Sequence, residues 1–188
     1  SIFAIFNGKK INFEFDHLQT TDSIIIEQDL TTKSSKIKNF KDYIVFLKRN
    51  KIVLDHNERE KIILSKINKV SQSKDYKKVI NPHLLEEVIN IVEDPNILLV
   101  NFDKEYLKIP QEIIISTLEK HQRYFPIFDI RNRLTNYFFV VANKKDEKRL
   151  ITEGNKRVVD ARLSDAKFFW DKDRSKNLIK QIANLKDL

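Results

Sequence analysis

Apolar side chains between residues 153 and 173 recur at intervals of four, three and four residues, which is the period of one helical face. The positions that form this stripe are Val159, Leu163, Ala166 and Trp170. A second stripe of the same segment is polar or charged and comprises Arg157, Asp160, Ser164, Lys167, Asp171 and Arg174. The pattern predicts an amphipathic helix with one face in a core and a charged face that water or a partner covers. Gly154 and Asn155 are predicted to open this helix, because Asn is a favoured N-cap.

Four further segments carry helical periodicity, each behind a start signal. Asn and Asp side chains accept hydrogen bonds from the free N–H groups of a first helical turn, and Pro fits the first helical position. The predicted starts are Asn39 for a helix to about Asn50, Asp55 with Glu58 in capping-box spacing for a helix through Val70, Asn81-Pro82 for a helix through Val92, and Pro110 for a helix that stops near His121.

Two regions outside these helices are predicted to contain strands, one near the start of the chain and one in its second half. Asn7-Gly8 supplies the two left-handed positions of a tight turn, so residues 3–15 are predicted to form a hairpin. Residues 17–35 are predicted to be loop with one short strand at Ile24–Ile26. Further on, the apolar run 96–100 predicts a buried strand, and alternation around a polar turn at residues 130–133 predicts a second hairpin.

Helices and strands are thus mixed without the strict alternation of a parallel sheet. The sequence predicts an α+β fold with a mixed, largely antiparallel sheet and packed helices, forming one domain over residues 1–174. Residues 175–188 are amphipathic and are predicted to be a helix that leads toward a following domain. The chain starts with Ser and contains no Met, which indicates a piece of a longer protein.

Composition narrows the classes of function. With 188 residues, 41% of them apolar, the chain is long enough to bury one good core. Lys and Arg outnumber Asp and Glu by 35 to 27, and the net charge of +8 favours a polyanionic partner, although lysine-rich surfaces also serve solubility. The chain has no cysteine, which excludes disulfides, thiolate chemistry and Cys-based zinc sites and is compatible with an intracellular location. No run approaches the roughly 20 apolar residues of a membrane span.

Candidate chemistry is sparse. The two glycines form no phosphate-binding loop, and none of the four histidines has a second ligand at helical spacing, so no metal site is predicted. The segment "HQRYF" has two interpretations. His121 and Arg123 complement the negative end of a helix while Tyr124 enters the core, or the three residues contact phosphates and bases of RNA. The residues alone favour the first interpretation, and Arg162 with Asp165 has the spacing of an ordinary surface ion pair.

Longer sequence words carry a family resemblance. "LLEEVINIVEDPNILLVNFDKEYLKIPQEIIISTLEKHQRYFPIFD", "FFVVANKK" and "GNKRVVDARLSDAKFFWDKD", which span about residues 84–173, resemble the beta subunit of bacterial glycyl-tRNA synthetase. The chain departs from the family at Lys156, where the family usually has Glu, and in the stretch Thr20–Ser23, where a Gly-His-Arg word is common. The resemblance also suggests a B3/B4-type domain by analogy of fold.

The resemblance implies a fragment from the N-terminal half of a subunit that binds tRNA and completes an alpha-two beta-two assembly in the cytoplasm. It implies no cofactor in this fragment, because ATP with magnesium belongs to the alpha subunit, and no catalytic residue of its own. Two alternatives stay open: an editing hydrolase, to which His121 or Asp165 would contribute, and a purely structural interaction domain. The candidate tRNA-binding residues inside the family words are His121, Arg123, Tyr124, Lys156, Arg157 and Arg162. RNA contact is favoured for Arg123 and Arg157, and a structural role for Arg162.

Overall fold

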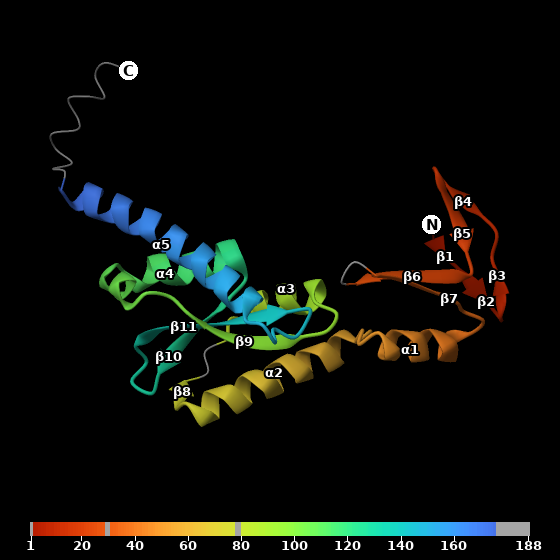
Figure 1. Ribbon diagram of the computed structural model, residues 1–188, viewed down its shortest axis with the longest axis horizontal. Helices are drawn as coiled ribbons and strands as arrows, with labels where there is room; N and C mark the ends of the chain where they lie inside the picture. Colours follow the sequence, from red (N-terminus) through yellow and green to blue (C-terminus); the bar gives the residue numbers. More distant parts are fainter. Residues whose placement is uncertain (1, 29–30, 78–79, 176–188) are drawn as a thin grey trace, which may run out of the picture. The chain divides into compact units, whose positions relative to one another are not determined.

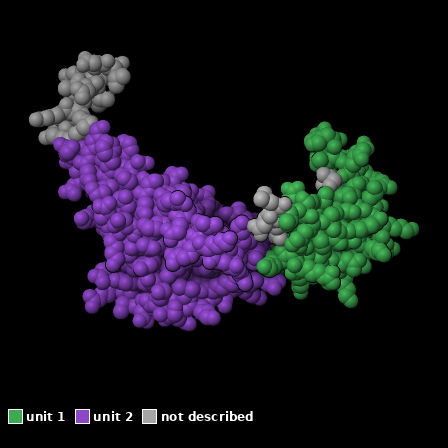
Figure 2. Space-filling view, viewed as in Figure 1, with its two compact units in different colours: residues 1–55 green, residues 56–188 purple. Residues whose placement is uncertain are grey.

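A computed structural model describes residues 2–28, 31–77 and 80–175. Contacts divide the chain into two compact units, unit 1 (Ser1–Asp55) and unit 2 (His56–Leu188), shown green and purple in Figure 2. The region predicted as one domain over residues 1–174 therefore contains two compact units, a subdivision that the sequence did not predict. The predicted helix at residues 175–188 lies, apart from Ser175, outside the described residues.

Unit 1 consists of short strands and one helix. Asn7 and Gly8 have φ values of 47° and 75°, and the tight turn they form joins two antiparallel strands, so the first predicted hairpin is confirmed in part. Its paired segments are only two residues long each. The elements are β1 (Ile2–Phe3), β2 (Ile5–Phe6), β3 (Lys9–Lys10), β4 (Glu14–Phe15), β5 (Leu18–Thr21), β6 (Ser23–Gln28), β7 (Thr31–Lys36) and α1 (Phe40–Arg49).

The prediction of mostly loop for residues 17–35 is wrong. That segment holds β5 and a β6–β7 hairpin, paired from Ser23↔Lys36 to Gln28↔Thr31. The sequence hid β7 because "TTKSSK" is polar and largely exposed, so it lacks the apolar alternation of a half-buried strand. The adjoining α1 confirms its prediction, since the Asn39 side chain accepts a hydrogen bond from the Asp42 N–H at 3.0 Å.

Unit 2 is built on an antiparallel four-stranded sheet with the order β8-β10-β11-β9. The predicted strand at 96–100 and the second hairpin, which turns at residues 130–133, are both confirmed. The elements of this unit are α2 (His56–Ser73), β8 (Tyr76–Lys77), α3 (Pro82–Ile91), β9 (Asn96–Asn101), the 3₁₀ turn η1 (Lys104–Lys108), α4 (Gln111–Ser116), the π-helical turn η2 (Thr117–His121), β10 (Phe125–Asp129), β11 (Leu134–Ala142) and α5 (Leu150–Ser175).

Side chains alternate across the sheet and divide the core into two clusters. Phe139 of β11 packs with the buried residues of α2 and α3, among them Ile63 and Val88. Its neighbour Phe138 faces the other way, into a cluster with residues of η1, α4 and α5. Unit 2 is therefore a three-layer arrangement, and Figure 1 shows α2 and α5 on opposite sides of the sheet. The α+β class with a mixed, largely antiparallel arrangement is confirmed.

The helix starts are mostly as predicted. The Asn81 side chain accepts from the His83 N–H at 3.1 Å, with Pro82 at the first helical position. The helix after Asp55 is present, while its capping box with Glu58 stays a prediction. The chain also becomes helical directly after Pro110.

The predicted start of the long helix is wrong. Gly154 and Asn155 lie inside α5, which begins four residues earlier at Leu150. Its first turn is capped from outside, because the Asp146 carboxylate accepts hydrogen bonds from the N–H groups of Ile151 and Thr152 at 3.0 and 2.7 Å.

Candidate nucleic-acid interface where η2 meets β10 and α5

The segment "HQRYF" forms a sharp corner between a helix and a strand. The helix that starts after Pro110 closes with the π-helical turn η2, whose Thr117 and Leu118 are buried. Two residues later Arg123 adopts a left-handed conformation, with φ of 59°. The Tyr124 N–H then donates to the Leu118 carbonyl at 2.9 Å and starts the strand. Both π turns and left-handed non-glycine residues are enriched at functional sites, so this corner is the best-supported candidate among the described residues.

Arg123 ties the corner to α3. Its guanidinium pairs with the Glu87 carboxylate and also donates to the carbonyl of Lys120. A second link joins the same elements, because the Asn81 amide donates to Glu119 at 2.9 Å. These contacts favour a structural role for Arg123, at the carbonyl end of a helical segment where a cation is stabilised. Its assignment to RNA binding stays a prediction.

Tyr124 turns into the core of unit 2. Its ring stacks on Phe138 with centroids 5.2 Å apart, and its hydroxyl donates to the Asn155 side chain. Asn155 in turn donates to the carbonyl of Ile151 at 2.7 Å. Burial raises the pKa of Tyr124, and the nearby positive charge of Arg162 opposes that rise. The corner thus brings Tyr124, Asn155 and Arg162 together, with one face of the Tyr124 ring packed on Phe138, and the assignment of Tyr124 to RNA binding stays a prediction.

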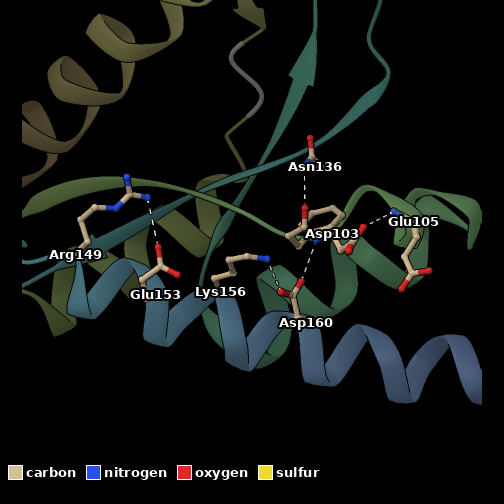
Figure 3. Close-up of polar contacts among 8 residues, drawn as sticks. Asp103, Glu105, Asn136, Arg149, Glu153, Lys156 and Asp160 are labelled. Carbon is tan, nitrogen blue, oxygen red and sulfur yellow. Dashed lines mark hydrogen bonds and ion pairs between the residues drawn. The ribbon is translucent and has the colours of Figure 1, made fainter.

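Lys156 is engaged in a second polar network, shown in Figure 3. Its ammonium lies 2.6 Å from the Asp160 carboxylate, which also accepts the Asp103 N–H at 3.0 Å. Asp103 caps η1 by accepting from the Glu105 N–H at 3.0 Å. This chain of bonds fastens η1 to α5 and leaves Lys156 half-buried, so its geometry is that of a positioning residue.

His121, Arg157 and Arg162 are exposed, as Arg123 is, but they differ from it in their contacts. Within the described part of the chain, none of the three forms an ion pair or side-chain hydrogen bond. The expected pairing of Arg162 with Asp165 is wrong, and Asp160 and Asp171 pair with Lys156 and Lys167 instead. Lysines four residues away occupy these carboxylates in geometry that suits a helix. The two arginine guanidinium groups and the His121 ring are therefore available to a phosphate group.

The residues that hold this corner in place were not predicted from the sequence. Asn155 was predicted as a cap, whereas its amide bridges Tyr124 and its own helix. Glu87 and Asn81 belong to α3 and its cap, whose packing against the corner has no local signature. Only Asp146 had a usable signal, since an Asp shortly before an apolar run is a common cap.

The described residues contain no group of three His, Cys, Asp or Glu side chains that could hold a metal ion. Among the helices that the structure describes, none combines the length and apolar character of a membrane span.

The fold and the corner define an α+β protein with exposed arginines, and comparison with known proteins gives its family. A model of the family "Glycyl-tRNA synthetase beta subunit" matches residues 1–188. The chain belongs to this family.

Relatives named glycine–tRNA ligase beta subunit extend the match beyond residues 84–173. The protein of Thermodesulfovibrio yellowstonii is 33% identical over 98% of the chain, and that of Listeria monocytogenes serovar 1/2a is 34% identical over 100%. The protein of Buchnera aphidicola subsp. Acyrthosiphon pisum is 39% identical over 91%. These stretches cover 27%, 27% and 25% of the relatives, so the chain spans about a quarter of the length of the proteins it matches.

Proposed function

We propose that the chain is the N-terminal part of the beta subunit of a glycine–tRNA ligase and contributes to glycyl-tRNA synthesis by binding tRNA and supporting assembly. Glycine, ATP and magnesium are then handled by the alpha subunit of a cytoplasmic alpha-two beta-two enzyme. The family match over the whole chain carries the proposal. The net charge of +8 supports the tRNA-binding part.

The candidate residues of the corner fall into two sets, one with contacts inside unit 2 and one exposed to solvent. Arg123, Tyr124 and Lys156 fix the geometry through contacts inside unit 2. His121, Arg157 and Arg162 are exposed, and the two arginines offer their charge to the RNA backbone. Arginine suits this role because its planar guanidinium can donate two hydrogen bonds to one phosphate. The contacts are therefore expected to strengthen tRNA binding without reading its sequence.

The test uses the full-length beta subunit together with its alpha subunit. Arg157→Ala and Arg162→Ala are expected to raise the KM for tRNA several-fold and to leave the KM for glycine unchanged. Each lost phosphate contact lowers the slope of log K against log salt by about 0.7 to 0.9. Arg131→Ala, an exposed arginine on the β10–β11 turn, is the matched control.

Arg123→Ala has a different expected signature. Loss of its links to Glu87 and Lys120 lowers the melting temperature and leaves the salt slope unchanged. An unchanged tRNA KM and salt slope for both Arg157→Ala and Arg162→Ala would remove the corner from the RNA interface. Altered alpha–beta association in those variants would then assign it to assembly.

A further inference from the structure

The helix α5 carries a second apolar stripe on the side opposite its core stripe. Ala161 lies two residues from both Val159 and Leu163, so it points away from the core. Leu150 and Phe168 share its face, at intervals of eleven and seven residues, and they are 71% and 61% exposed. The helix is therefore apolar on two opposite sides.

Neighbouring positions widen this exposed surface. Val158 is 42% exposed and Phe169 is 59% exposed, and the rings of Phe168 and Phe169 meet edge to face with centroids 5.5 Å apart. At Gly154 an added Cβ would meet no atom within 4 Å. With roughly 200 Å² per phenylalanine, the two rings alone expose about 240 Å². We call the surface formed by Leu150, Val158, Ala161, Phe168 and Phe169 the outer face of α5.

Two ion pairs of α5 form a flank beside this face. Lys156 pairs with Asp160, and Lys167 pairs with Asp171, along one side of the helix. The sequence-based assignment of a charged stripe opposite the core is therefore corrected, because these pairs lie between the core stripe and the outer face. Paired charges at the edge of an apolar strip are the arrangement found around the apolar centre of protein interfaces.

We infer that the outer face of α5 is covered by an apolar surface from the remainder of the same subunit. This inference rests on the proposed function, since the chain spans only about a quarter of its relatives. A helix that is apolar on both sides is typical of a buried helix.

Charge favours protein over RNA as the occupant. The helix carries six basic and five acidic residues, so its surface has almost no net positive charge. A surface that binds single-stranded RNA by stacking also needs a positive groove for the backbone. The cations near the rings are already engaged there, with the Lys172 ammonium 5.7 Å from the Phe168 centroid and the Arg174 guanidinium 5.9 Å from that of Trp170.

Hydroxyl-radical footprinting of the unmodified full-length beta subunit tests the inference without a variant that could fail to fold. Oxidation of Phe168 and Phe169 is measured by mass spectrometry and divided by the rate in the denatured subunit. Fully buried Phe138 is the internal reference for protection. The inference predicts that Phe168 and Phe169 are protected at least ten-fold in the isolated beta subunit, approaching the protection of Phe138.

Three other outcomes overturn it. Reactivity close to the denatured rate under every condition means that the outer face is exposed to water. Protection that appears only with tRNA assigns the face to RNA, and protection that appears only with the alpha subunit assigns it to the subunit interface. Glycylation by the same preparation is measured in parallel, so that active enzyme with reactive Phe168 and Phe169 overturns this inference alone, whereas inactive enzyme counts against the proposed function.

Discussion

At the scale of single residues, the Asp146 carboxylate is the group on which the start of α5 depends. Burial opposes its ionisation, but hydrogen bonds from Thr152 and Ile151 outweigh burial and lower the pKa of Asp146 below its usual 3.8. The pKa of Asp129 is lowered as well, because the Arg133 and Arg131 N–H groups donate hydrogen bonds to its carboxylate in the β10–β11 turn. Both groups are more acidic in the folded chain than in the unfolded chain.

The first prediction concerns pH. A depressed folded-state pKa contributes stability that is present above the unfolded pKa of about 3.9 and is lost as pH falls through the folded pKa. Asp146→Ala is expected to lower the melting temperature at pH 7 and to flatten the loss of stability below about pH 4. Thermal melts from pH 7 to pH 2 check this, with exposed Glu147→Ala as the neighbouring control. Equal melting curves for the two variants would show that Asp146 does not cap the helix.

At the scale of elements, some features of α5 were predicted from the sequence pattern and others were not. Its core stripe is confirmed, because Val159 and Leu163 are fully buried and Trp170 packs against the same cluster. Its first four residues were missed because the cap, Asp146, lies outside the periodic segment. The outer face was missed because Leu150, Ala161 and Phe168 are spaced too widely to stand out beside the charged residues between them.

The second prediction tests the core stripe. Leu163→Ala removes buried methyl groups between α5 and the sheet and is expected to lower the free energy of unfolding by about 2 to 5 kcal/mol. Asp165→Ala changes an exposed position two residues away and is expected to have an effect within about 0.5 kcal/mol. Urea unfolding measures both. A loss below about 1 kcal/mol for Leu163→Ala would contradict the packing of α5 on this core.

At the scale of the whole molecule, local signals were sufficient for the α+β class and for both hairpin turns, since Asn7-Gly8 and the polar turn at 130–133 each stop an apolar alternation. Contacts between distant segments were not predictable in this way. Arg123 is tied to Glu87 while Arg162 lacks a carboxylate partner among the described residues, and neither arrangement could be anticipated from the sequence. Ion-pair partners depend on packing, and a single sequence records only spacing along its own helix.

The central claim, that the chain acts within a glycine–tRNA ligase, is tested most directly by aminoacylation. Full-length beta subunit is mixed with its alpha subunit, and transfer of labelled glycine to tRNA is followed with ATP and magnesium. Glycyl-tRNA is expected to form only when both subunits are present. Arg157→Ala is expected to lower the rate at subsaturating tRNA, and high tRNA is expected to restore it. Absence of glycyl-tRNA from the complete, folded pair of subunits would show that the chain does not act within a glycine–tRNA ligase.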